Sequence, residues 1–379
     1  MKKNPVVLIG GNHYNGLGLV RAFAKFQVPA YAIIIGKNAK KGFTAQSKHW
    51  KEVFCVIDEE QIPECLNLIL KKCSLKPVII AWSDSAAAFI DKHYEELKAD
   101  FFLPSINHEG GRIFDMMDKK NQLEFANRCG LDTAKTWKMS LPCTVLPDDI
   151  VFPVIVKPVC SAEGEKKDIK KISNEGELLD YLDVLCHKGY LNILIQEYLI
   201  FTEEYDILGS VNRSMSSAVI TKKVRNWPNV GGSTSYSFTT DDETLKRISQ
   251  KLISELMSMN YCGLFDVDLF SVGNKIYFNE INWRNSALGY VANNSSVYYQ
   301  VNWYASVLGK KVKNEVYYPK SCGKYSMNEM MDFHHFLNGD MTFIAWLRDL
   351  RRCTGFAYKD NHDMRPFFYK LMWPLLKRL

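Results

Sequence analysis

The chain has 379 residues, of which 47% are hydrophobic and 24% charged, so we expect a globular protein of two or three lobes, not a disordered or fibrous one. Its net charge of +6 is mild and its basic residues are interspersed with acidic ones, so nucleic-acid binding is not expected. The ten cysteines are scattered without a Cys-x-x-Cys pair, which argues against zinc and a disulfide framework and favours the reducing cytoplasm.

Residues 1–112 have the pattern of a doubly wound, Rossmann-like α/β domain. Apolar strands separated by amphipathic helices favour a parallel sheet, and they are expected at residues 6–9, 30–35, 53–57 and 78–82. The first strand runs into a glycine-rich turn, where such folds bind ligands. The turn does not match Gly-x-Gly-x-x-Gly, and Gly36 stands where a dinucleotide site has an acidic residue, so such a site is not expected. No apolar run is long enough for a signal peptide or a membrane span.

A second lobe is expected at residues 113–192. It begins with a helix over residues 113–129 and continues with a strand at residues 153–158. Lys157 ends this strand, where a lysine is costly unless it meets an anion such as phosphate or reaches out to solvent. Lys119 on the helix is a weaker candidate for the same role, because lysines are common on helix surfaces.

A third lobe, residues 193–310, contains the most informative segment, a predicted hairpin. Asp268 on its first arm, and Glu280 with Asn282 on its second, alternate with apolar residues, so their side chains converge on one face. Facing carboxylates repel unless a cation lies between them, and oxygen ligands favour Mg²⁺; an exposed acidic face would show the same pattern. Arg284 adds a permanent cation beside this face. Metal and arginine together suit the stabilisation of a phosphoryl group in transfer.

The connection at residues 195–199 has the form of an interlobe segment. Its backbone groups can hydrogen-bond an adenine ring and its apolar side chains can enclose it, although this signal is weak alone. Glu204 follows closely and is a candidate for the ribose hydroxyls, with the adjacent Glu203 as the alternative.

Four motifs, in this order and spacing, resemble the ATP-grasp superfamily, and Asp268 completes the set. The motifs are residues 117–119 (Met-Asp-Lys), 153–158 (Pro-Val-Ile-Val-Lys-Pro), 196–199 (Gln-Glu-Tyr-Leu) and 278–282 (Phe-Asn-Glu-Ile-Asn). Around the lysines and the hairpin the chain resembles D-alanine:D-alanine ligase, whereas residues 282–284 are more similar to biotin carboxylase and carbamoyl phosphate synthetase. Residues 282–286 and the overall length also resemble D-aspartate ligase and related proteins of surface-polysaccharide and peptidoglycan pathways.

The resemblance implies an ATP-grasp fold behind a Rossmann-like domain, and a carboxylate–amine ligase that forms an amide through an acyl phosphate. ATP would be bound by Lys119, Lys157, Gln196, Glu197, Tyr198, Leu199 and Glu204. Asp268, Glu280 and Asn282 would hold two Mg²⁺ ions, for which Mn²⁺ can substitute, and Arg284 would be the catalytic residue. The loop at residues 160–167 departs from the family because it is charged and poor in glycine, so no phosphate contact is assigned there.

Candidates for contacting the small-molecule carboxylate and amine substrates lie outside these motifs. They are Gly11 and Asn12 in the first turn, Lys222, Lys223 and Arg225 before a glycine loop, and Ser286 after the hairpin. For the three cations a solvated strand edge is an equal alternative. The substrates would be an amino acid and a sugar acid or cell-wall precursor. Two rival functions are a bicarbonate-dependent carboxylase of the same fold and an ATP-binding regulatory protein without turnover.

Residues 311–379 are expected to form a C-terminal helical extension. Its last segment, residues 364–379, combines aromatic and basic side chains, so it would suit weak contact with a membrane surface or packing against the body of the enzyme. The sequence does not indicate an oligomeric state.

Overall fold

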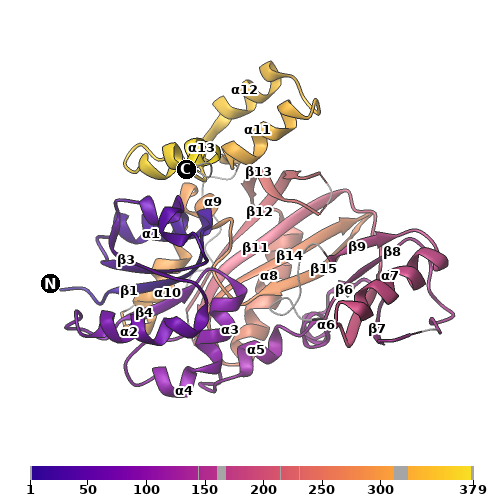
Figure 1. Cartoon of the computed structure of the whole chain (residues 1–379), viewed down its shortest axis with the longest axis horizontal. Coiled ribbons are helices and arrows are strands. Elements are labelled where there is room, and N and C mark those ends of the chain that lie inside the picture. Colours follow the sequence, from indigo (N-terminus) through magenta and orange to yellow (C-terminus); the bar gives the residue numbers. More distant parts are fainter. Residues whose placement is uncertain are drawn as a thin grey trace.

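The structure is a computed structural model that describes residues 2–143, 145–159, 168–213, 215–229, 231–310 and 323–376. The N-terminal domain and the small lobe lie on either side of a long sheet that belongs to the large lobe (Figure 1). The C-terminal helices lie over one end of that sheet (Figure 1). The loop expected at residues 160–167 lies outside the described residues.

The N-terminal domain is built on a parallel sheet in the strand order β3-β2-β1-β4, as the apolar runs predicted. Its elements are β1 (Val6–Gly11), α1 (Tyr14–Lys25), β2 (Ala30–Ile35), β3 (Trp50–Val56), α2 (Ile62–Leu70), β4 (Val78–Ala81), α3 (Asp84–Lys92) and α4 (Tyr94–Leu97). The central strands are buried almost throughout because both faces of a parallel sheet are covered. This confirms the α/β fold class.

The small lobe is an antiparallel sheet in the order β7-β10-β8-β9, covered by α7. Its elements are β7 (Thr136–Ser140), β8 (Val154–Pro158), β9 (Lys170–Ile172), α7 (Glu175–His187) and β10 (Asn192–Glu197). The expected boundary at residues 192–193 places β10 in the large lobe, whereas β10 pairs with β7 and β8 on both of its edges. The division therefore falls after Glu197.

The large lobe contains a sheet in the order β17-β16-β13-β12-β11-β14-β15-β6. Its main elements are β11 (Glu203–Asn212), β12 (Met215–Trp227), β13 (Ser233–Thr240), α8 (Glu243–Ser258), β14 (Tyr261–Val272), β15 (Lys275–Asn282), α9 (Gly289–Asn294) and α10 (Tyr299–Val307). Two short strands that precede the small lobe also join it: β5 (Ser105–Ile106) pairs with β14, and β6 (Asp132–Thr133) pairs with β15.

The single helix expected at residues 113–129 is two helices, α5 (Arg112–Met116) and α6 (Lys119–Arg128). The break occurs because Asp118 leaves the helical conformation and its carboxylate accepts the N–H of Lys120 at 2.8 Å. An aspartate in this position caps a new helix. Lys119 therefore lies in the first turn of α6 and not on the outer surface of a long helix, and it is 6% exposed.

The sequence suggested a purely helical C-terminal extension, but the structure contains two strands there as well as helices. Its helices are α11 (Glu329–Leu337), α12 (Phe343–Arg352) and α13 (Arg365–Leu376), and its strands β16 (Tyr325–Met327) and β17 (Cys353–Phe356) continue the large sheet. Part of α13 packs against the N-terminal domain: Phe367 contacts its core, and the Lys370 ammonium lies 5.3 Å from the centre of the Phe43 ring. None of the described helices has the length and apolar character that a bilayer crossing requires.

Candidate active site

A row of acidic side chains crosses one face of the large sheet. Asp206 on β11 is opposite Asp268 on β14, and Asp268 is opposite Glu280 on β15. The next pair along is Asp266 and Asn282. Residues two apart in a strand and residues paired across strands share a face, so these side chains all lie on the same side of the sheet. The register brings Asp268, Glu280 and Asn282 together, as their alternation predicted.

Lys223 on β12, one of the cations that the sequence suggested for substrate binding, lies at one end of this row. Its ammonium is 2.5 Å from Asp268, 2.7 Å from Glu204 and 3.0 Å from Asp206. Burial lowers the pKa of this lysine, but the carboxylates outweigh burial and raise it well above its ordinary value, so Lys223 carries a charge. Burial also raises the pKa of Asp206, and Lys223 opposes that rise.

Lys119 and Lys157 lie next to the other end of the row. The Lys119 ammonium donates to Glu280 at 2.5 Å, and this cation holds the pKa of Glu280 well below its usual range. The Lys157 ammonium donates to the Gln196 side chain at 2.7 Å. Burial, together with the charge of Lys119, lowers the pKa of Lys157 to about 7. Two buried lysines with one carboxylate between them form a site suited to an additional anion.

The residues on this face fit a hard cation only in part. The two carboxylates expected to bind Mg²⁺ are each paired with a lysine, and no three described His, Cys, Asp or Glu side chains form a ready metal cage. Asp266 was missed by the sequence analysis, and its Oδ1 is buried without a hydrogen-bond partner. Burial, then the charge of Asp268, raises the pKa of Asp266 to about 7. This set of oxygen ligands fits Mg²⁺ if phosphate oxygens and water complete the coordination.

Arg284, which follows β15, joins this face to the N-terminal domain. Its guanidinium donates two hydrogen bonds to Asp84 at the start of α3, at 2.7 and 3.2 Å, and a third to Asn282 at 3.2 Å. A guanidinium held on both sides in this way is fixed in position, because its donor groups are planar and rigid. Arg284 is thus fixed beside the acidic row, where the sequence placed it.

The N-terminal turn approaches the same region through Asn15. The Asn285 side-chain amide donates to the Asn15 side-chain oxygen, and the Asn15 side-chain amide donates to the backbone carbonyl of Asn285 at 2.9 Å. The two expected substrate residues of this turn have structural partners: the Gly11 carbonyl accepts from the Trp82 indole at 2.9 Å, and the Asn12 side chain accepts the N–H of Thr44 at 3.1 Å.

The other residues expected to contact substrate do not lie together in the structure. Lys222 is adjacent to Lys223 in the strand, so it lies on the opposite face and pairs with Glu203. Arg225 binds Asp332 and Asp349 of the C-terminal extension at 2.9 and 2.7 Å. Ser286 is 1% exposed and lowers the pKa of Asp266, so its side chain lies close to the acidic row.

The expected adenine segment, residues 196–199, begins in the last two residues of β10 and continues beyond the strand. The N–H of Glu197 donates to the Lys135 carbonyl at 2.9 Å, and that of Tyr198 donates to the Pro153 carbonyl at 3.3 Å. Gln196 faces inward to Lys157, and Glu204 faces the acidic row, where it also accepts from Asn226 at 2.7 Å. Leu199 is half-buried after the strand.

Comparisons with known proteins agree with this architecture. No family model matches the chain. A stretch of 184 residues is 23% identical to formate-dependent phosphoribosylglycinamide formyltransferase of Prochlorococcus marinus; it covers 48% of this chain and 45% of that relative, which is less than half of its length.

Solved structures match over most of the chain. N5-carboxyaminoimidazole synthetase from Staphylococcus aureus, complexed with ADP, is 15% identical and superposes with a TM-score of 0.62 over 83% of this chain and 80% of that one. L-amino acid ligase from Bacillus licheniformis is 13% identical, with a TM-score of 0.61 over 83% and 78% of the two chains. At such identities the likeness establishes the fold, and the chain has the ATP-grasp fold that its motifs resemble.

Proposed function

We propose that this protein is an ATP-dependent carboxylate–amine ligase that releases ADP and forms a carbon–nitrogen bond. The observation that carries the proposal is the set of Lys119, Lys157, Glu280, Asp268 and Arg284, which gathers cations and oxygen ligands on one face between the lobes. Such a set suits phosphoryl transfer, in which catalysis is mostly positioning and neutralisation of charge. The ATP-grasp fold and its ligase neighbours support it.

In the proposed reaction a substrate carboxylate oxygen attacks the γ-phosphorus of ATP and ADP leaves. Lys119 and Lys157 bind the phosphates, residues 196–199 hold the adenine, and Glu204 binds the ribose. The amine nitrogen then attacks the carbonyl carbon of the acyl phosphate, the carbon–nitrogen bond forms, phosphate departs and the amine loses a proton. Arg284 stabilises the charge that builds on the reacting oxygens.

Asp268, Glu280 and Asn282, together with Asp266, are the residues that would hold two Mg²⁺ ions, or Mn²⁺ in their place. When bound, these ions would neutralise phosphate charge. The proteins that this chain resembles in residues 282–286 suggest an amino acid joined to a sugar acid or cell-surface precursor. Ser286 and Lys223 are the residues best placed to contact the acceptor, because both reach the acidic row.

ADP release from purified protein with ATP and Mg²⁺ tests the proposal, with pools of amino acids, uronic acids and bicarbonate as stimulants. We expect a pool containing an amine and a carboxylate to stimulate release, Arg284→Ala to abolish it, and Lys222→Ala on the opposite face to leave it unchanged. Stimulation by bicarbonate alone would instead identify a carboxylase, a rival that the synthetase neighbour favours. Tight ATP binding without turnover under every condition would indicate a regulatory protein.

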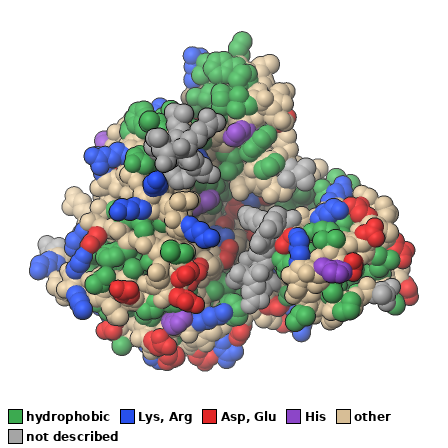
Figure 2. Space-filling view, in the orientation of Figure 1, with side chains coloured by type: hydrophobic (Ala, Val, Ile, Leu, Met, Phe, Trp, Pro, Cys, Tyr) green, Lys and Arg blue, Asp and Glu red, His purple; other side chains and the backbone are tan. Residues whose placement is uncertain are grey.

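The proposed place of action is the cytoplasm, since the cysteines in the described part of the chain are all free thiols. Weak contact with a membrane surface through α13 is also proposed. Its Phe368, Leu371 and Met372 side chains are at least half exposed. In the same extension, hydrophobic side chains also gather over α11 and α12 (Figure 2). Cosedimentation with anionic vesicles, reduced by Leu371→Ser, is the expected result; no cosedimentation would remove this proposal.

A further inference from the structure

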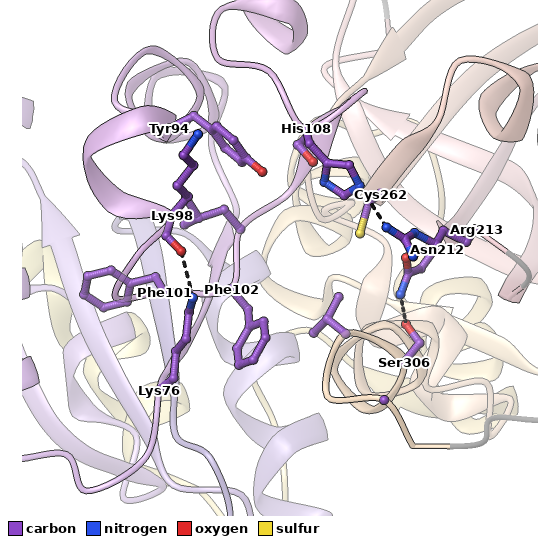
Figure 3. Close-up of a pocket in the computed structure, with 14 residues that line it drawn as sticks. Lys76, Tyr94, Lys98, Phe101, Phe102, His108, Asn212, Arg213, Cys262 and Ser306 are labelled. Carbon is purple, nitrogen blue, oxygen red and sulfur yellow. Dashed lines mark hydrogen bonds between the residues drawn. The ribbon is translucent and has the colours of Figure 1, made fainter.

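A second cavity, of about 350 Å³, lies where the N-terminal domain meets the large lobe and shares no lining residue with the candidate active site. Figure 3 shows its two walls facing each other across an open space. One wall comes from the end of the N-terminal domain and carries Lys76, Tyr94, Lys98, Phe101, Phe102 and Leu103. The other belongs mainly to the large lobe and carries Asn212, Arg213, Cys262 and Ser306, with His108 beside them.

The inner surface of the cavity is apolar. Phe101, Leu103 and Cys262 are less than 9% exposed, and the half-buried Phe102 ring points into the space (Figure 3). Burial raises the pKa of the Cys262 thiol to about 11, so this side chain is neutral and behaves as an apolar group. The cavity therefore has an apolar floor, and the Phe102 ring is the aromatic surface that it offers to a flat ligand.

The rim of the cavity is cationic. Lys76, Lys98, Arg213 and His108 line it, and none of the described lining residues is acidic. Lys98 pairs with Glu95, and the Lys76 ammonium donates to the Lys98 carbonyl at 2.7 Å. The Arg213 guanidinium contacts only the His108 ring, at 3.4 Å, among the residues that the structure describes. A charged guanidinium without a carboxylate partner at the mouth of an apolar cavity is a natural anion contact.

We propose that this interdomain cavity binds a small organic anion, a carboxylate or phosphate carried on a flat apolar body. The anionic group would lie between Arg213 and Lys76 on opposite walls, and the body would lie over Phe101, Phe102 and Leu103. The cavity volume is at the lower end of the range typical of ligand pockets, which suits a single ring system with one charged substituent.

Anilinonaphthalene sulfonate, an aromatic anion that becomes fluorescent in apolar sites, is the probe that tests this site. Binding is measured by fluorescence titration with saturating ATP and Mg²⁺ present, so that the active site is occupied. We expect Arg213→Glu and Lys76→Glu each to weaken binding about tenfold or more, because each removes one charge-assisted contact and adds repulsion. Arg247→Glu, on the exposed surface of α8, changes the net charge equally and should leave binding unchanged.

Several outcomes would overturn the proposal. One is an equal effect of Arg247→Glu and the two cavity variants, which would indicate a general charge effect. Another is loss of the signal in Ile344→Ser, since Ile344 is 80% exposed on the C-terminal extension and offers the probe a competing apolar surface. A probe signal that is present without ATP and absent with saturating ATP would place the probe in the active site. Circular dichroism confirms the fold of each variant, and the two cavity variants come from different walls, so misfolding of one leaves the other as the test.

Discussion

Replacing Lys223 with methionine is the sharpest test of the described site. Methionine keeps most of the volume and apolar stem of lysine but removes the charge. The variant leaves Glu204, Asp206 and Asp268 clustered without the cation that lies within 3.0 Å of each of them. Lys222→Met is the matched control, because Lys222 is the next residue, lies on the other face and pairs with a half-exposed Glu203.

The two variants should differ widely in stability. Removing one partner of a buried ion pair costs about 3–5 kcal/mol, whereas removing an exposed pair costs about 0–1 kcal/mol. The cost in Lys223→Met depends on pH. Because Lys223 lowers the pKa of Asp206, the variant raises that pKa further. A carboxyl whose folded-state pKa is raised stabilises the fold below the unfolded pKa and loses this contribution as pH rises through the folded pKa. The destabilisation should therefore be small in acid and largest above neutral pH.

Urea unfolding followed by circular dichroism between pH 5 and pH 8 measures both effects. We expect the midpoint of Lys223→Met to fall increasingly below that of the wild type as pH rises, while Lys222→Met follows the wild type. Millimolar Mg²⁺ should stabilise Lys223→Met more than the wild type, because the freed carboxylates can bind it. Equal midpoints for the two variants across this range would refute the placement of Lys223 among the carboxylates.

Three further variants test other parts of the site. Glu280→Gln should abolish turnover while ATP binding without Mg²⁺ survives in equilibrium dialysis; unchanged turnover would remove the metal assignment. ATP binding at pH 8 should be accompanied by uptake of a proton, because the pKa of Lys157 is about 7 in the ligand-free protein and a bound phosphate restores the charge of this lysine. Calorimetry in buffers of different ionisation enthalpy measures the uptake. Lys157→Arg should eliminate it. Arg225→Gln should make the C-terminal extension sensitive to limited proteolysis, because it leaves the buried Asp332 unpaired, whereas the exposed Arg348→Gln should not.

The elements predicted well are those with a local pattern. The strands of the N-terminal domain are continuous apolar runs, and the arms of the hairpin alternate acidic and apolar residues around a turn at Gly273. The helix expected at residues 113–129 was wrong in one detail, because apolar periodicity does not register a single capping residue such as Asp118. The lobe boundary was misplaced because β10 pairs with strands on both sides, which is a tertiary property.

The sequence analysis missed or misplaced several site residues because it could not tell which face of a strand points toward the site. The sequence proposed both Lys222 and Lys223, and the register of β12 places only Lys223 opposite Glu204 and toward the acidic row. Asp266 could have been found, because it lies two residues before Asp268 and must share its face. The pairing of Arg225 could not be predicted, since its partners Asp332 and Asp349 are more than a hundred residues away in the chain.

The pairing of lysines with the expected metal ligands links these observations. Lys119 neutralises Glu280 and Lys223 neutralises Asp268, so the protein stabilises its own carboxylates before any metal arrives. A divalent ion that enters alone must compete with the Lys119 and Lys223 ammonium groups for the carboxylates. An ion that arrives with ATP brings phosphates, and the two ammonium groups can pair with these phosphates instead. The arrangement favours binding of metal and nucleotide together, which protects the carboxylates from unproductive cations. On this reasoning, Lys223→Met should bind Mg²⁺ in the absence of ATP, and the wild type should bind Mg²⁺ only weakly under the same conditions.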